Sequence, residues 1–131
     1  MAGGKEKRKE SGILIAVVNN HVQSVVHMSN FLEMHGYRTV WAYSGDAAVK
    51  LCERERPDLL VLDAQMPGMT GFDVARELPR QKILFTVADR AVAEKAKKFP
   101  NCAGTIHKPV DNRELDDFIR SVFGLKKPVL E

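Results

Sequence analysis

The sequence has little cysteine, no long hydrophobic run and only a small excess of charge, and each shortage excludes a class of protein. Its two cysteines, Cys52 and Cys102, have a spacing that fits neither a disulfide framework nor a zinc site. We expect two reduced thiols in a cytoplasmic protein. No apolar run approaches the ~20 residues of a membrane helix, and the charged N-terminus lacks the apolar stretch of a secretory signal.

The net charge of +3 is mild, and much of the basic excess lies near the two ends. No aromatic side chains interleave with those charges, so solvated tails are expected rather than a nucleic-acid surface. We expect a disordered N-terminal tail at residues 1–11 and a C-terminal tail at 126–131. The remaining chain has the length and the mix of hydrophobic and charged residues of one globular domain.

Between the tails, strand-like and helix-like segments alternate. Ile13–Val18 and Leu59–Leu62 are unbroken apolar runs, as in strands that are buried on both faces. Further strands are expected at residues 37–42, 83–85 and 105–107, and helices at 21–35, 44–55, about 71–78, 89–99 and 111–124. Such alternation predicts an α/β fold with a doubly wound parallel sheet and helices on both faces.

Several local signals set the helix boundaries and the expected inner faces. Ser44 is a predicted helix cap, Asp111 and Glu114 have capping-box spacing, and Gly124 closes the last helix. The side chains expected to face inward are Val22, Val25, Val26 and Leu32 in the first helix, and Ala47, Ala48, Leu51 and Cys52 in the second.

Polar residues follow the predicted strands, and in an open α/β sheet ligands bind at that edge. Asn19 and Asn20 follow the first strand, Asp63 the third, Thr86 the fourth and Lys108 the fifth. A carboxylate can attack phosphorus as a nucleophile. An ammonium and a hydroxyl can both bind phosphate oxygens. The predicted convergence is therefore typical of a site that accepts a phosphoryl group.

Three segments resemble one known family. Residues 57–71, PDLLVLDAQMPGMTG, resemble the phosphoacceptor segment of response-regulator receiver domains. Ile106-His107-Lys108-Pro109 resembles the lysine motif of that family, and Phe85-Thr86-Val87-Ala88 its hydroxyl motif. The resemblance covers about residues 13–124, and it implies a receiver domain at 12–125 with a flavodoxin-like sheet in the order 2-1-3-4-5.

The resemblance also implies the roles of the site residues and the partners. Asp63 would be the phosphoacceptor of a two-component phosphorelay, Thr86 the switch hydroxyl and Lys108 the phosphate-binding lysine. Expected partners are a sensor histidine kinase or phosphotransfer protein and a downstream protein target, with neither nucleic acid nor membrane bound through this domain. A homodimer through the last two helices is a further option. The domain would not be an enzyme beyond self-phosphorylation and self-dephosphorylation at Asp63.

The metal site departs from the family pattern. Receiver domains have an acidic pair where this chain has Asn19 and Asn20. The usual three carboxylates and one lysine sum to −2, whereas Asp63 and Lys108 sum to zero. Mg²⁺ prefers charged oxygen ligands. We therefore expect weak Mg²⁺ binding, through Asp63, the backbone carbonyl of Gln65 and the side chain of Asn20. With little competition, Asp63 is expected to pair directly with Lys108.

Two further departures leave a second interpretation open. Val87 replaces a very small residue and could crowd the site, and Thr105 replaces the switch aromatic, although both residues are ordinary in strands. His21 is either a metal ligand or a solvated residue at a helix start. The alternative function is a pseudo-receiver that binds proteins without phosphorylation. An aspartyl hydrolase would need an acid at Gln65, and a flavin carrier would need a phosphate-binding loop after the first strand.

Overall fold

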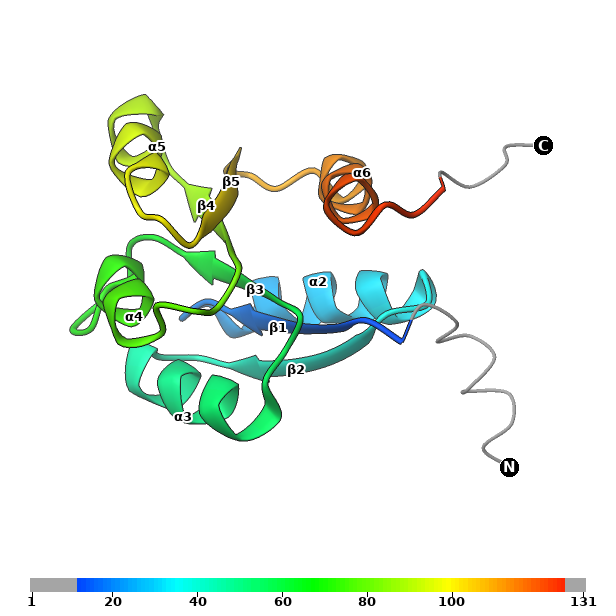
Figure 1. Ribbon diagram of the computed structural model, residues 1–131, viewed down its shortest axis with the longest axis horizontal. Coiled ribbons are helices and arrows are strands. Elements are labelled where there is room, and N and C mark those ends of the chain that lie inside the picture. Colours follow the sequence, from blue (N-terminus) through cyan, green and yellow to red (C-terminus); the bar gives the residue numbers. More distant parts are fainter. Residues whose placement is uncertain (1–11, 127–131) are drawn as a thin grey trace.

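The computed structural model describes residues 12–126, in which five strands form one parallel sheet (Figure 1). The order across the sheet is β2-β1-β3-β4-β5, with every neighbouring pair parallel. The strands are β1 (Leu14–Val18), β2 (Arg38–Ala42), β3 (Leu59–Asp63), β4 (Ile83–Val87) and β5 (Cys102–His107). The predicted doubly wound, flavodoxin-like sheet and its strand order are confirmed. The predicted tails, apart from Lys126, lie outside the described residues.

Within residues 12–126, four helices connect these strands and a fifth follows β5, and together they cover both faces of the sheet (Figure 1). Their bounds are α2 (Val22–Met34), α3 (Gly45–Glu55), α4 (Gly71–Glu77), α5 (Arg90–Lys97) and α6 (Asn112–Phe123). Buried side chains of α2 and α6 pack on one face, and those of α3, α4 and α5 on the other. Within residues 12–126, none of the helices has the length and apolar character needed to cross a membrane.

The apolar runs of the sequence form the centre of the sheet because both of their faces are covered. All five residues of β1, β3 and β4 are buried. In β3, Leu60 and Leu62 pack under α3, α4 and α5, whereas Leu59 and Val61 pack under α2 and α6. Full burial of one such side chain contributes about 1.5–3 kcal/mol. This packing fixes the strand register, and with it the position of Asp63 at the end of β3.

The predicted caps are present at the helix ends. The Ser44 hydroxyl accepts a hydrogen bond from the backbone N–H of Ala47, at the start of α3. Asp111 accepts from the backbone N–H groups of Arg113 and Glu114 at the start of α6. Gly124 ends α6 with φ at +66°, a left-handed conformation that glycine adopts without strain.

Four expectations, three about orientation and one about length, were wrong. Ala47 and Val26 are exposed, because each lies next in sequence to a buried residue and so about 100° around its helix from the core. Val22, in the first turn of α2, is also exposed. The fifth strand begins at Cys102 rather than at residue 105. Gly104, which suggests a loop in sequence, lies within that strand, and the Phe118 ring occupies the space of its missing side chain.

A buried polar network ties Tyr37, the residue just before β2, to α6. The Tyr37 hydroxyl donates to the Asp116 carboxylate at 2.9 Å, and that carboxylate also pairs with Arg120 at 3.1 Å. A second nitrogen of Arg120 donates to the backbone carbonyl of Lys126 at 2.7 Å. Burial, reinforced by Asp116, raises the pKa of Tyr37 above its usual range. The network thus joins the start of an edge strand to the last helix and to the backbone that follows it.

Candidate functional site

The carboxyl ends of β3, β4 and β5 bring together the residues that the sequence predicted. Asp63 is the last residue of β3 and pairs in register with Thr86 of β4. Both are buried although both are polar. The backbone N–H of Gln65 donates to Asp63 Oδ1 at 3.3 Å, so the loop after β3 turns back over the carboxylate.

Lys108 reaches this carboxylate from the far side of β4. Its backbone N–H donates to Val87 at 2.8 Å, which fixes the chain just after β5. Its ammonium lies 3.0 Å from Asp63 Oδ1, and its side chain is 34% exposed against 3% for Asp63. The predicted direct pair between Asp63 and Lys108 is therefore present, and it neutralises the buried acid.

The hydroxyl of Thr86 lacks a hydrogen-bond partner among the described residues. Its backbone is engaged, because its carbonyl accepts from the N–H of Ala64 at 3.0 Å. A buried hydroxyl without a partner costs about 1–3 kcal/mol. Thr86 lies opposite Asp63 on the next strand. Its hydroxyl could therefore donate a hydrogen bond to an oxygen atom that is added at Asp63.

The loop that follows Asp63 is held by close packing at two glycines. A Cβ on Gly71 would lie 2.4 Å from the carbonyl oxygen of Asp63, and a Cβ on Gly45 would lie 2.7 Å from Met69. On either side of Gly71, Thr70 and Asp73 form a reciprocal capping box at the start of α4. Hydrogen bonds from Thr70, with Arg76 nearby, hold the pKa of Asp73 below its usual range. The carboxylate of Asp73 is therefore used in the cap at the start of α4.

A hollow of about 620 Å³ opens over Asp63. Among the residues that line it are Asn20, His21 and Lys108, together with three that the sequence reasoning missed: Asp73, Arg76 and Lys95. The Thr70-to-Asp73 spacing is a capping signal that could have located Asp73. Arg76 and Lys95 had no such signal, because only the packing of α4 beside α5 brings them to one rim.

The two asparagines that replace the acidic pair have different environments. The side-chain oxygen of Asn19 accepts from the backbone N–H of His21 at 2.9 Å, so it caps the turn into α2. Asn20 is exposed and lines the hollow. His21 also lines the hollow, and its role as a metal ligand stays a prediction.

These residues do not fit a tight Mg²⁺ site. Within residues 12–126, no group of three or more His, Cys, Asp or Glu side chains could hold a metal ion. The carboxylate of Asp63 already takes an ammonium and a backbone N–H on one oxygen. Asn20 offers only a neutral amide oxygen, whereas Mg²⁺ prefers charged oxygen ligands and gives up water reluctantly.

The two other departures from the family pattern lie in the sheet. Val87 is fully buried in the core under α3, α4 and α5, and it is not among the residues that line the hollow. The expected crowding of the hollow by Val87 is therefore not seen. Thr105 is half-buried in β5, in register with Phe85.

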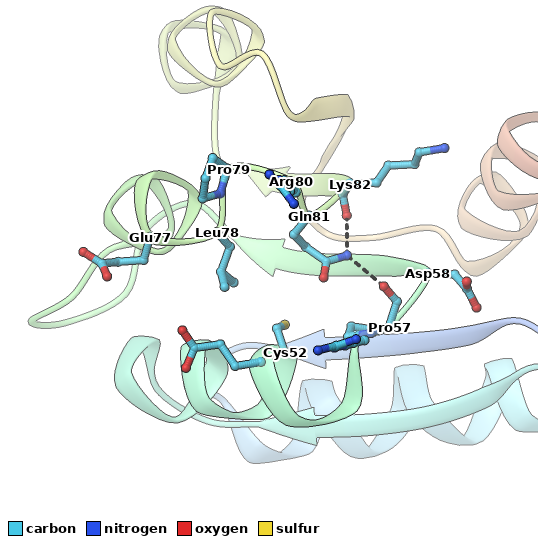
Figure 2. Close-up of a pocket in the computed structure, with 11 residues that line it drawn as sticks. Cys52, Pro57, Asp58, Glu77, Leu78, Pro79, Arg80, Gln81 and Lys82 are labelled. Carbon is cyan, nitrogen blue, oxygen red and sulfur yellow. Dashed lines mark hydrogen bonds between the residues drawn. The ribbon is translucent and has the colours of Figure 1, made fainter.

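A larger hollow, of about 810 Å³, lies at the amino ends of β3 and β4, opposite to the ends that carry Asp63 and Thr86 (Figure 2). It lies between the ends of α3 and α4, and its lining carries charges of both signs. The Gln81 amide donates to the backbone carbonyls of Pro57 and Lys82, both at 3.1 Å. Cys52, which also lines it, is a free and buried thiol. None of the site residues predicted from the sequence lines this hollow.

Comparison with known proteins identifies the family. The family described as "Response regulator receiver domain" matches residues 15–120. The alkaline phosphatase synthesis transcriptional regulatory protein PhoP of Bacillus subtilis is 30% identical over 115 residues, covering 82% of this chain and 47% of PhoP. Protein PilH of Pseudomonas aeruginosa is 28% identical over 115 residues, covering 82% of this chain and 95% of PilH. The chain belongs to the response regulator receiver domain family.

Solved structures agree on the fold. A response regulator receiver domain protein from Clostridium thermocellum superposes with a TM-score of 0.78 at 20% identity, covering 86% of this chain and 94% of that one. A receiver domain protein from Methanospirillum hungatei gives 0.77 at 20% identity, with the same coverage. The chain spans about half the length of PhoP and of the Streptomyces coelicolor regulator AfsQ1. Receiver domains are signalling modules of two-component systems, and they interact with histidine kinases or phosphotransfer proteins and with output domains.

Proposed function

We propose that this receiver domain, residues 12–125, accepts a phosphoryl group on Asp63 from a histidine kinase or phosphotransfer protein in the cytoplasm. The pair between Asp63 and Lys108 at 3.0 Å, beside the unpartnered hydroxyl of Thr86, carries this proposal. The acid and the ammonium are in place before any donor arrives, so little rearrangement is needed.

The residues suggest how the transfer would proceed. Both described hydrogen bonds to the Asp63 carboxylate fall on Oδ1, so Oδ2 is the oxygen for attack on phosphorus. A new O–P bond forms, the N–P bond of the donor histidine breaks, and the histidine keeps the electron pair and takes a proton. The Lys108 ammonium moves to the added phosphoryl oxygens, and the Thr86 hydroxyl donates to one of them.

We further propose that Mg²⁺ contributes less here than in receivers with the acidic pair. In those receivers a divalent cation compensates a net charge of −2. At this site, Asp63 and Lys108 already sum to zero. The neutral oxygen of Asn20 replaces a charged ligand, so the affinity for Mg²⁺ falls.

The transfer is tested by incubating the protein with acetyl phosphate and measuring the intact mass. We expect an adduct of about 80 Da on the native chain and none on the matched variant Asp63→Asn. A receiver with the usual acidic pair serves as the positive control. Absence of the adduct under conditions that label that receiver, or an adduct that persists in Asp63→Asn, contradicts the proposal.

The Mg²⁺ dependence is tested by restoring acid at the asparagine pair. Asn20→Asp should steepen the dependence of labelling on Mg²⁺, because it adds a charged oxygen at the rim of the hollow. Asn19→Asp should have a smaller effect, since the side chain of Asn19 caps the turn into α2. If labelling of the native chain already requires Mg²⁺ as strictly as that of Asn20→Asp, weakened dependence is refuted.

The alternative, a pseudo-receiver that binds its protein target without phosphorylation, is favoured by one observation. Asn19 and Asn20 replace the acidic pair, and the side-chain oxygen of Asn19 is used to cap the turn into α2. This alternative predicts that Asp63→Ala keeps its affinity for the target. A loss of binding in a variant with an intact circular-dichroism spectrum rejects it.

A further inference from the structure

The hollow over Asp63 is lined by more positive than negative side chains. Two carboxylates, Asp63 and Asp73, line it together with three cationic side chains, Lys108, Arg76 and Lys95. With the histidine of the lining neutral, the net charge of the lining is therefore +1. A net positive charge attracts anions to such a hollow and opposes the entry of a divalent cation.

Ion pairing accounts for two of these three cations. The ammonium of Lys108 pairs with Asp63 at 3.0 Å, and the guanidinium of Arg76 pairs with Asp73 at 3.1 Å. The other carboxylate oxygen of Asp73 accepts the two hydrogen bonds of the helix cap. Lys95 forms no ion pair within the part of the chain that the structure describes. Its exposed ammonium is thus the positive charge of the hollow that lacks a carboxylate partner.

Two stacked aromatic rings hold cations at this side of the hollow. The rings of Phe72 and Phe99 have centroids 5.3 Å apart and an interplanar angle of 8°. The Lys95 ammonium lies 5.0 Å from the centroid of Phe72, and the Arg76 guanidinium lies 5.4 Å from that of Phe99. Phe72 is itself buried and lines the hollow. A cation–π contact at an exposed position is weak. It therefore keeps the Lys95 ammonium at the wall and releases it to a stronger anionic partner.

Phosphoryl transfer would increase the demand for positive charge at this site. Once phosphorylated, Asp63 carries about two negative charges, and Lys108 offsets one of them. The hydroxyl of Thr86 and the amide oxygen of Asn20 are both neutral. One negative charge is therefore left for another cation of the hollow.

We propose that Lys95 is a second phosphate-binding residue of this site, whose ammonium binds the phosphoryl group without a divalent cation. The inference rests on the proposed transfer to Asp63 and names the residue that supplies the charge. A lysine ammonium on its flexible stem can turn from the Phe72 ring to phosphoryl oxygens. The guanidinium of Arg76 is less free to do so, because Asp73 already holds it.

Binding of inorganic phosphate in the presence of EDTA tests this role apart from phosphoryl transfer. Asp63→Asn, which cannot accept a phosphoryl group and frees Lys108, is the parent for the titration, followed by the backbone amide shifts of residues that line the hollow. We expect a dissociation constant on the order of 1–10 mM. Adding Lys95→Gln should raise that constant at least about fivefold, whereas Lys95→Arg should keep it within about twofold.

Lys97→Gln in the same parent is the matched control. Lys97 lies on the same helix, is exposed and pairs with Glu94 at 3.8 Å, and it does not line the hollow. The substitution removes the same charge as Lys95→Gln does. It should change the dissociation constant for phosphate by less than about twofold, because a charge away from the site is screened by salt.

Three results would overturn this role of Lys95. These are an unchanged affinity for phosphate in Lys95→Gln, equal weakening by Lys97→Gln, and no binding up to about 100 mM phosphate.

Labelling of the native chain by acetyl phosphate separates the two proposals. A chain that is labelled, but binds phosphate equally well without Lys95, keeps the proposed function and rejects this inference. Phosphate binding that depends on Lys95, in a chain that is never labelled, supports the anion site and rejects the transfer.

Discussion

Removing Lys108 should cost more stability than removing Asp63, although both substitutions break the same ion pair. The reason is burial, because the Asp63 side chain is 3% exposed whereas that of Lys108 is 34% exposed. In Lys108→Met the carboxylate stays buried and loses its counter-charge. In Asp63→Asn the freed ammonium can turn to solvent, and an amide replaces the acid at nearly the same volume.

The structure bounds the size of this difference. At 3.0 Å and an effective dielectric constant of about 20, the Coulomb energy of the pair is about 5 kcal/mol. Partial exposure of Lys108 reduces that value, since exposed pairs contribute about 0–1 kcal/mol and loss of one partner of a buried pair costs about 3–5 kcal/mol. We therefore expect Lys108→Met to destabilise the fold by about 2–3 kcal/mol and Asp63→Asn by less than about 1 kcal/mol.

Urea unfolding of the native chain, the two single variants and the double variant measures both values. The double variant should regain most of the stability lost in Lys108→Met, because no unpaired charge is left buried. Equal losses in the two single variants would refute the reasoning, as would a double variant no more stable than Lys108→Met. The m-value should stay constant, which shows that compactness is unchanged.

Three further predictions concern packing, the free hydroxyl and pH. In urea unfolding, Gly71→Ala should destabilise the fold by more than about 2 kcal/mol, because its Cβ would lie 2.4 Å from a backbone oxygen. Its control, Gly68→Ala, has open space around the new Cβ but a positive φ, and should cost only about 1 kcal/mol. Thr86→Val should leave stability unchanged or higher, since it removes an unpartnered buried hydroxyl, while the yield of the phosphoryl adduct falls. Burial raises the pKa of Cys52 to about 12. The unfolded chain therefore releases this proton first, and stability is lost as pH rises from about 9 to 12. In Cys52→Ala, the free energy of unfolding measured in urea should fall less steeply with pH, by up to about 1.4 kcal/mol per pH unit.

Most of the fold could be predicted because its signals are local. Unbroken apolar runs located the central strands, and the strand order followed from the family resemblance. The caps at Ser44 and Asp111 depend on one side chain and the next few backbone N–H groups, so they can be read from the sequence. The wrong expectations depended on tertiary packing. Val26 looks like a core residue, and only the way α2 lies on the sheet leaves it outside.

The residues of the site also divide into those with a local sequence signal and those that only tertiary packing brings together. Asp63, Thr86 and Lys108 lie at or just after the carboxyl ends of strands and could be found by that rule. Arg76 and Lys95 lie on different helices, and only the packing of α4 beside α5 places them at one hollow. The use of Asn19 as a turn cap was also hidden, because the same residue type can bind a ligand or cap a helix.

The network of Tyr37, Asp116 and Arg120 has a consequence for the backbone that leaves α6. Arg120 donates to Asp116 through one nitrogen and to the Lys126 carbonyl through another. The backbone at Lys126 is thereby held against α6 and, through Tyr37, linked to the segment that precedes β2. A rotation of α6 would therefore carry the backbone at Lys126 with it, because Arg120 turns with the helix and holds that carbonyl.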